Sequence, residues 1–447
     1  MLGGLAGIVA FRPLAIPTGE LKMLKQLTGI IVCLLMLLVS AASAKENILY
    51  SFQGGADGSS PHAGLTHDRL GNLYGTTSKG GEGMCFGLGC GTVFMLTRGD
   101  NNTWTKSTIH TFNDGIGGGV PVGTLAIDPK GNLYGVTEQG GTGPCDSVLG
   151  AGCGVIYRLS PNGDGTFGFK VLYSFSQPGT VDDGSYPNAG VVIGRDGSLY
   201  GTTEFGGSFV CDCGIVYRLT ANGGQWRETV LYSFVGISQG GSDVSFPSDT
   251  VTIDSDGNIF GTGSGGGDVL CNDGCGGVYV LVPQGGAYQE HVLHIFEGGN
   301  DGAAPQGEVT LDASGNIFGT TGAGGGGTHC DQGCGIVFEL EKTGDQFQYK
   351  IIYRFDGING AEPFSALLLD NSEIFGTTAA GGTAAEGTAF RLSQVSGTWK
   401  ETALYNFGRG SDGTVPFAPL IGNSRVGFFG TTAGGGQGHA GTVFQLH

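Results

Sequence analysis

One ten-residue pattern recurs seven times along this chain and constrains its fold more than any other feature. Its first copy reads NLYGTTSKGG (72–81), and every later copy keeps an aromatic residue, a Gly and a Gly-Gly pair. The copies begin at residues 72, 132, 198, 258, 316, 373 and 427. A regular period of this length is typical of repeat architectures, in which each unit buries its apolar face against its neighbours.

Each repeat contains four short segments of β-type composition. In the first repeat they are GLTHD (64–68), NLYGTT (72–77), GTVFML (91–96) and TIHTF (108–112). Val, Ile, Tyr, Phe and Thr dominate these segments, and Gly, Asp, Asn or Pro bound them. No amphipathic helix pattern appears after residue 44. The chain holds 91 Gly among 447 residues, which fits many strands joined by tight turns.

Seven four-stranded units predict an all-β fold, a seven-bladed β-propeller over residues 45–447. The chain ends support a closed ring. Residues 46–52 are a lone copy of the fourth segment, and residues 441–447 are a copy of the third. We therefore expect the N-terminal strand to complete the seventh blade and remove two exposed edges. The alternative, an open solenoid, needs capping repeats, and the sequence shows none.

The aromatic residue of the ten-residue pattern is expected to pack between blades, with an aromatic ligand platform as the functional alternative. We expect the Gly that follows it to let neighbouring backbones approach closely. The seven aromatic residues are Tyr74, Tyr134, Tyr200, Phe260, Phe318, Phe375 and Phe429.

The N-terminus resembles an export signal. Residues 23–44 contain Lys25, an apolar run and the small residues Ala42-Ser43-Ala44. This is the pattern of a secretory signal peptide cleaved before Lys45, and residues 1–22 precede it as an extension. An uncleaved anchor is the alternative, although the apolar run is short for a bilayer span. We expect a secreted or periplasmic protein with no membrane span after cleavage.

The net charge restricts the classes of partner. The chain carries −18 at pH 7, and cleavage before Lys45 would remove three basic residues and one acid to give −20. Such a surface disfavours nucleic acid and anionic membranes. It suits cations, neutral sugars, or simply solubility. We expect a monomer.

The repeated "LYGTT..GG…GTVF.L" pattern resembles the GloVer tandem-repeat family of exported bacterial proteins, also described as "choice-of-anchor" proteins. The similarity extends over residues 46–447 and recurs in every unit. The resemblance implies export and a propeller-like fold. It implies no activity that maps onto particular residues.

Ten cysteines form five local pairs between the second and third segments of the first five repeats. An even number of cysteines in an exported chain favours disulfides that staple the longer loops. Zinc binding is the alternative, with two thiolates per loop as half a site. Cys211 and Cys213 are the most constrained pair because one residue separates them. The pairs are Cys85/Cys90, Cys145/Cys153, Cys211/Cys213, Cys271/Cys275 and Cys330/Cys334.

Binding residues are expected on the face formed by the loops between repeats and the cysteine loops. A recurring acid in the inter-repeat loop could bind Ca²⁺ or act on a glycan, but a turn-initiating Asp before Gly explains it equally. His62 and His329 break the repeat in loops of this face. The candidate acids are Asp57, Asp114, Asp183, Asp243, Asp301 and Asp412.

The sequence supports two classes of function. The first is a non-enzymatic binding or scaffold module for carbohydrate or for a protein at the cell envelope, with no cofactor other than an optional Ca²⁺. The second is a polysaccharide hydrolase or lyase that uses the same loop face. No nucleophile-elbow, zinc-protease, P-loop or dinucleotide motif is present.

Overall fold

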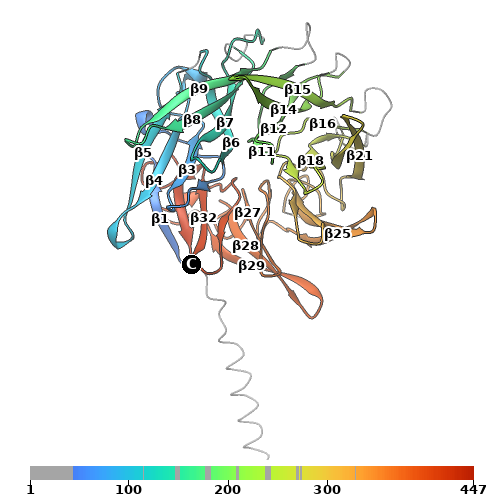
Figure 1. Cartoon of the computed structure of the whole chain (residues 1–447). Helices are drawn as coiled ribbons and strands as arrows, with labels where there is room; N and C mark the ends of the chain where they lie inside the picture. Colours follow the sequence, from blue (N-terminus) through green and yellow to red (C-terminus); the bar gives the residue numbers. More distant parts are fainter. Residues whose placement is uncertain are drawn as a thin grey trace, which may run out of the picture. The chain divides into compact units, whose positions relative to one another are not determined.

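In the computed structural model each repeat forms a four-stranded antiparallel sheet, and seven such sheets form the ring of a β-propeller (Figure 1). In the sheets made of four consecutive strands, the first strand lies nearest the axis and the last lies at the periphery. The structure describes residues 44–447 apart from 114, 146–151, 177–182, 208–210, 237–242, 268–270, 272–273 and 328. The proposed signal peptide lies outside the described residues.

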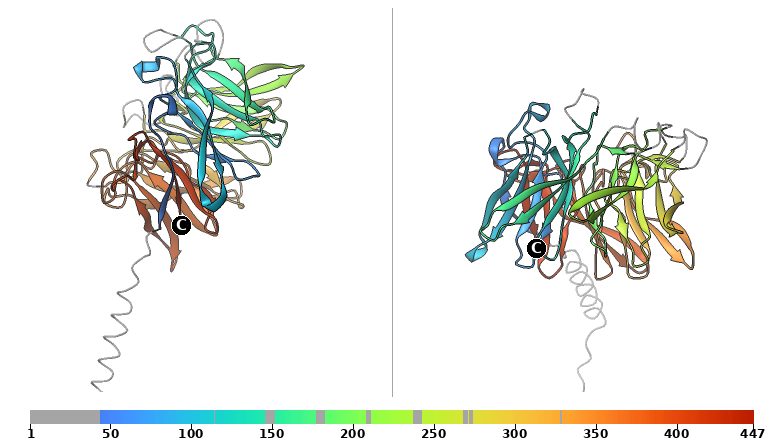
Figure 2. Two further views of the ribbon diagram at one scale, coloured as in Figure 1. Left: turned by 90° about the vertical axis from the view of Figure 1, so that its left-hand side faces the viewer. Right: turned by 45° about the horizontal axis from the view of Figure 1, so that its top comes forward.

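We number the blades I to VII, and their strands run in chain order from the axis outward in blades I to VI. Seen from the side, neighbouring blades stand next to one another around the ring (Figure 2). The strands are β2 (Thr66–His67), β3 (Leu73–Thr77), β4 (Thr92–Arg98) and β5 (Trp104–Thr111) in blade I; β6 (Gly119–Ile127), β7 (Leu133–Gln139), β8 (Val155–Pro161) and β9 (Phe167–Ser174) in II; β11 (Val192–Ile193), β12 (Leu199–Thr203), β14 (Ile215–Asn222) and β15 (Gln225–Ser233) in III; β17 (Thr252–Ile253), β18 (Ile259–Gly263), β20 (Gly277–Gln284) and β21 (Ala287–Ile295) in IV; β22 (Thr310–Leu311), β23 (Ile317–Thr321), β24 (Ile336–Thr343) and β25 (Gln346–Arg354) in V; β26 (Leu368–Asp370), β27 (Glu373–Thr378), β28 (Thr388–Val395) and β29 (Thr398–Asn406) in VI; and β31 (Ile421–Asn423), β32 (Gly427–Thr432), β34 (Thr442–Leu446) and β1 (Glu46–Ser51) in VII.

Blade VII joins the two ends of the propeller. Strand β1 pairs antiparallel with β34, with Glu46 opposite Leu446 and Ser51 opposite Thr442. The expectation that the N-terminal strand completes the seventh blade is therefore confirmed. The pairing covers the outer edge of β34 with a strand of the same chain, and β1 becomes the outer strand of blade VII.

The remaining elements are short. Three two-stranded ladders, β10 (Gly184–Ser185) with β13 (Phe205–Gly206), β16 (Val244–Ser245) with β19 (Gly265–Gly266) and β30 (Gly413–Thr414) with β33 (Gly434–Gly435), brace loops. The only helical elements among the described residues are the 3-10 turns η1 (Gly55–Asp57), η2 (Cys85–Gly87) and η3 (Asp100–Asn102). None of the described helices is long and apolar enough to span a membrane.

The Gly after the recurring aromatic residue has a different purpose from the one expected. Gly75 on β3 faces Phe94 on β4, and a Cβ at Gly75 would lie 2.5 Å from the Phe94 ring. The Gly therefore makes room for an aromatic ring of its own blade, and the expectation of a close backbone neighbour is wrong. The same pairing recurs in the other blades as Gly135–Tyr157, Gly201–Tyr217, Gly261–Tyr279, Gly319–Phe338, Gly376–Phe390 and Gly430–Phe444.

That ring in turn connects neighbouring blades. Phe94 packs edge-on against Phe52 of blade VII, with ring centroids 5.1 Å apart, and both side chains are fully buried. Equivalent Phe residues end the fourth segment of each repeat and make the same contact around the ring. The recurring Tyr74 also packs on the next blade, 6.3 Å from Phe167. This confirms its placement between blades, where apolar burial stabilises the ring.

All five predicted cysteine pairs are disulfides, and each closes a loop between the second and third strands of blades I to V. These bonds occupy the ten thiols that the zinc alternative would use, and among the described residues no group of three or more His, Cys, Asp or Glu is placed to hold a metal ion. Five disulfides indicate a protein that folds outside the cytoplasm. The bonds are Cys85–Cys90, Cys145–Cys153, Cys211–Cys213, Cys271–Cys275 and Cys330–Cys334.

Cys153 is held by backbone pairing in addition to its disulfide. Its side chain is fully buried, and its backbone forms an isolated parallel bridge with Gly140, directly after β7. The following residue adds to this pairing, because Gly154 N–H donates a 3.0 Å hydrogen bond to the Gly140 carbonyl. The physical reason is that the chain must return alongside the end of β7 before it enters β8. Backbone hydrogen bonds therefore hold this end of the loop together with the covalent bond.

Candidate functional site

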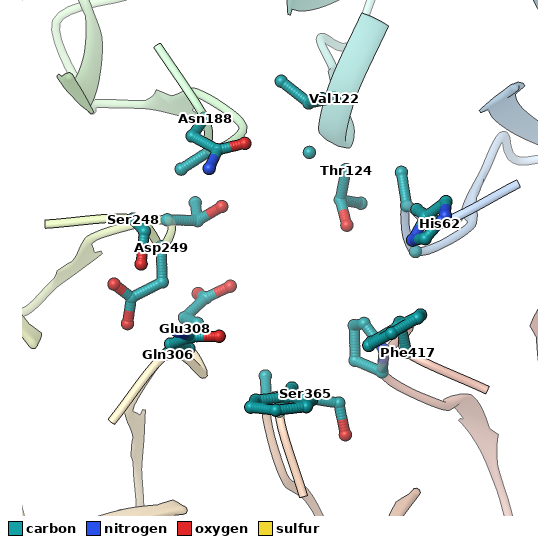
Figure 3. Close-up of a pocket in the computed structure, with 18 of the residues that line it drawn as sticks. His62, Val122, Thr124, Asn188, Ser248, Asp249, Gln306, Glu308, Ser365 and Phe417 are labelled. Carbon is teal, nitrogen blue, oxygen red and sulfur yellow. The ribbon is translucent and has the colours of Figure 1, made fainter. Parts of the chain in front are cut away.

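A pocket of about 460 Å³ opens on the axis of the ring, and residues from all seven blades line it (Figure 3). Its volume lies within the range of small-molecule sites. Every blade contributes the residue directly after a recurring Pro of its inter-blade loop. These residues are His62, Val122, Asn188, Ser248, Gln306, Phe364 and Phe417.

A strained backbone position aims these side chains at the axis. The residue before each recurring Pro has a positive φ, between 52° and 58°, although none of the seven is Gly. At Ala304 the N–H donates to the carbonyl of Cys275 and the carbonyl accepts from Gly322 N–H, both at 3.0 Å. A left-handed residue before Pro is disfavoured and costs on the order of 1–3 kcal/mol. The seven residues are Ser60, Val120, Tyr186, Phe246, Ala304, Glu362 and Val415.

The disulfide loops support this geometry. In blades I to V the second Cys of the pair accepts, through its carbonyl, the N–H of the strained residue of the following blade. Val120 N–H donates to the Cys90 carbonyl at 2.8 Å, and Tyr186 N–H donates to the Cys153 carbonyl at 3.0 Å. The residue after Cys90 is Gly91, where a Cβ would lie 2.5 Å from the Pro121 ring. Each staple therefore holds both the hydrogen-bond acceptor and the surface on which the Pro rests. The cysteines themselves do not line the pocket.

Four carboxylates from neighbouring blades II to V form one side of the pocket, which we call the acidic arc: Glu138, Glu204, Asp249 and Glu308. Burial and the nearby Glu204 carboxylate raise the pKa of Glu138. Burial also raises the pKa of Glu204, although its Oε2 accepts a 3.2 Å hydrogen bond from Asn188 Nδ2.

Asp249 and Glu308 are the most deeply placed acids of the arc. Asp249 is 6% exposed, and its Oδ2 accepts a 2.6 Å hydrogen bond from the Thr262 hydroxyl. Burial, together with the Glu308 charge, raises the pKa of Asp249 well above its ordinary value. Burial raises the pKa of Glu308 to about 7, and its Oε1 lies 3.3 Å from the Thr252 hydroxyl. Glu308 can therefore change protonation state near neutral pH, and a ligand that alters the surroundings of either acid would shift its pKa.

Three rings from blades VI, VII and I form the opposite side, the aromatic arc. The rings of His62 and Phe417 stack with centroids 4.9 Å apart, and Phe364 stacks on Phe417 at 5.8 Å. A Cβ on Gly322 would lie 2.2 Å from the Phe364 ring, so Gly322 leaves room for this ring. Burial and the Lys79 charge lower the pKa of His62 to about 4. The arc is therefore uncharged at neutral pH and apolar on its face.

Of the residues predicted from sequence, only His62 lines the axial pocket. Five of the recurring acids bond to their own inter-blade loops, as Asp183 does with the Tyr173 hydroxyl at 3.0 Å and Ser176 N–H at 2.9 Å. His329 Nδ1 lies 2.9 Å from the Asp356 carbonyl. A binding role for these residues stays a prediction, and Asp114 lies outside the described residues. The five acids are Asp57, Asp183, Asp243, Asp301 and Asp412.

Sequence reasoning missed the acidic arc, Phe364 and Phe417. Their signal was present at two register positions where the repeats differ from one another. One lies one to three residues after the recurring Pro, and the other directly follows the Gly-Thr-Thr segment, as at Glu204. The repeated residues build the frame, while the varied residues lie in the pocket.

Comparison with known proteins supports this description of the fold. Residues 143–331 match the model of the Gloeobacter/Verrucomicrobia repeat. The match confirms the resemblance drawn from the recurring motif. None of the curated proteins compared with the chain matches it.

Among solved structures, the chain resembles a fungal alcohol oxidase of the AA5 family in complex with copper, with a TM-score of 0.52, 14% identity, and coverage of 90% of this chain and 76% of that one. Two weaker matches are a putative oxidoreductase (glucose dehydrogenase) from Thermus thermophilus and a protein of unknown function from Dyadobacter fermentans. Their TM-scores are 0.42 and 0.45, their identities 15% and 13%, and they cover 90% and 91% of this chain and 100% of each matched chain. At these identities the likeness extends to the fold alone.

Proposed function

We propose that this repeat protein is an exported carbohydrate-binding propeller whose axial pocket holds the sugar. The observation that carries the proposal is the division of the pocket into an aromatic arc and an arc of carboxylates and amides (Figure 3). A pyranose ring has an apolar face that stacks on aromatic rings and hydroxyls that donate to carboxylates and amide oxygens.

The polar side of the pocket offers suitable partners for hydroxyl groups. Asn188 and Gln306 present amides from blades III and V, next to the acids of the arc. The Ser248 hydroxyl lies buried in the wall with no hydrogen-bond partner among the described residues. Buried polar groups are normally paired, so an unpaired hydroxyl in a pocket wall fits a ligand contact.

The test is calorimetric titration of the full chain, produced with export to an oxidising compartment, against a panel of neutral and acidic oligosaccharides. We expect binding of at least one sugar and a loss of about tenfold in affinity in Phe417→Ala, which corresponds to about 1.4 kcal/mol of stacking. Phe167→Ala is the matched control, because Phe167 lies on the outer strand β9 and packs on Tyr74, outside the pocket lining. No binding across the panel, or equal losses in both variants, would refute the proposal.

Glycan hydrolysis is a second candidate, favoured by one observation. A general acid needs a carboxyl that stays protonated near neutral pH, and Glu308, with its pKa raised to about 7, meets this need beside Asp249. The assay is release of new chain ends from the same oligosaccharides. Release that disappears in Glu308→Gln supports hydrolysis; no release leaves the binding function.

A further inference from the structure

The axial pocket has a charge imbalance that a neutral sugar does not relieve. Four carboxylates line it, and its lining residues, all within the described part of the chain, include no Lys or Arg. The Lys79 charge lowers the pKa of His62, which lies in the aromatic arc on the side of the pocket opposite the acids. Removal of water on ligand binding favours the protonated form of these acids unless a positive charge lies beside them. A cationic ligand would supply that charge and hold the carboxylates ionised, whereas an uncharged ligand would not.

The aromatic arc narrows the kind of cation. Metal ions take oxygen ligands and gain nothing from the stacked His62, Phe417 and Phe364 rings. An organic cation with an apolar face uses both arcs, since an ammonium lies well beside carboxylates and its carbon skeleton packs on the rings. The amides of Asn188 and Gln306 add hydrogen-bond partners for hydroxyl groups on the same molecule.

We propose that the sugar bound in the axial pocket is an amino sugar, with its protonated amine at the acidic arc and its ring face on Phe417. The proposal rests on the carbohydrate-binding function proposed above. It specifies the ligand as a glycan that carries free amines, as opposed to one with N-acetyl groups or with hydroxyls alone. The ligand amine supplies the positive charge that the lining lacks.

Three β-1,4-linked tetrasaccharides that differ at one substituent per ring test the proposal: glucosamine, N-acetylglucosamine and glucose tetramers. Titration of the full chain at pH 6.5 and low salt is expected to show at least tenfold tighter binding of the glucosamine tetramer. The preference should shrink as NaCl rises to 0.5 M, because salt screens the charge contacts. Ethylamine serves as a probe without a sugar ring and is expected to bind at least a hundredfold more weakly.

Two variants separate the charge contact from the stacking contact. Glu204→Gln is expected to bring the affinity for the glucosamine tetramer to within threefold of that for the glucose tetramer, because it removes a negative charge and keeps an amide oxygen that accepts from hydroxyl groups. Phe417→Ala should weaken the binding of every tetramer that the parent protein binds, and by a similar factor for each of them. Glu341→Gln is the matched control, because Glu341 pairs with Lys350 outside the pocket.

A stability measurement shows whether the carboxylate is held for a ligand. Without sugar, Glu204→Gln should raise the thermal midpoint, because it removes a charge that repels Glu138; a carboxylate with a purely structural role would lower it. Equal affinity for the three tetramers would overturn the amino-sugar inference and leave the carbohydrate-binding proposal standing. Failure of every tetramer and of the wider panel would overturn both. Ethylamine binding as tight as the glucosamine tetramer would reduce the site to a simple cation site and also overturn the inference.

Discussion

The protein should become less stable as the pH rises, because of one register position on the outer strands of the blades. This position lies three residues before the recurring Leu or Ile of the fourth segment. In four repeats it is occupied by a Glu: Glu46, Glu228, Glu290 and Glu401. Glu228 on β15 illustrates the effect. Burial, followed by the Asp183 charge from the loop between blades II and III, raises the pKa of Glu228 to about 8. Its Oε1 is buried with no hydrogen-bond partner among the described residues.

The sign and size of the effect follow from proton binding. Below pH 4.5 this acid is protonated in the folded and unfolded chains alike. Between pH 4.5 and about 8 the unfolded chain releases the proton that the folded chain keeps, so stability falls through this window and levels off above it. The shift corresponds to roughly 5 kcal/mol, and residual solvent contact reduces our expectation to about 3 kcal/mol.

The perturbation is Glu228→Gln, and the assay is denaturant unfolding with intact disulfides at pH 4.5, 6, 7.5 and 9. The variant should equal the parent at pH 4.5 and exceed it by about 3 kcal/mol at pH 9. Lys106→Met is the control at the equivalent position of blade I, where Lys106 Nζ lies 2.8 Å from Asp57 Oδ1. Loss of that buried partner should destabilise by about 3 kcal/mol at neutral pH. The reasoning fails if Glu228→Gln shows no advantage at pH 9.

Three further predictions concern the frame. Ala304→Gly should raise the free energy of unfolding by about 0.5–1 kcal/mol, because Gly relieves the strain of a φ of 52°. The control Ala287→Gly lies on the regular strand β21 and should lower the free energy of unfolding. Both variants are compared by denaturant unfolding, and a loss of stability in Ala304→Gly would contradict the strain argument. Replacement of Cys330 and Cys334 by Ala should cost about 2 kcal/mol and speed protease cleavage of this loop, as the bridge closes a loop of sequence separation 4. An unchanged cleavage rate would show that the loop is rigid without its staple. Deletion of residues 45–52 should abolish the monomeric fold by size-exclusion chromatography, since β34 loses its outer neighbour and Phe52 leaves the core; a stable monomer would refute closure by β1.

Much of the architecture was predictable because the repeat states it seven times. Segment composition gave the strands, the repeat number gave the blades, and the unpaired segments at the two ends gave ring closure through β1 and β34. The cysteine pairs were predictable because each is local in sequence, whereas the backbone bridge between Cys153 and Gly140 was not. The purpose of Gly75 was not predictable either, because the ring that fills its space belongs to a different strand, β4.

The candidate site was much less predictable. Sequence reasoning chose the acids that repeat, such as Asp183, and the structure shows them bonding to their own loops. The pocket acids, such as Asp249 and Glu308, occur at varied positions and form no local motif. Variation between repeats at a fixed register position was the available signal. This variation indicates a site only when the side chains at that register position are known to face the axis of the ring.

The sequence by itself determined the unit of structure, the number of units and the way the ends meet, because these depend on local strand and turn preferences and on a periodic apolar pattern. The tertiary structure alone decided which side chains meet in the axial pocket. Residues about sixty positions apart meet only at the axis of the closed ring, where four acids from blades II to V face three rings from blades VI, VII and I. Their burial and mutual repulsion raise the pKa of the acids. Those properties belong to the assembled pocket, since no single repeat brings these groups together.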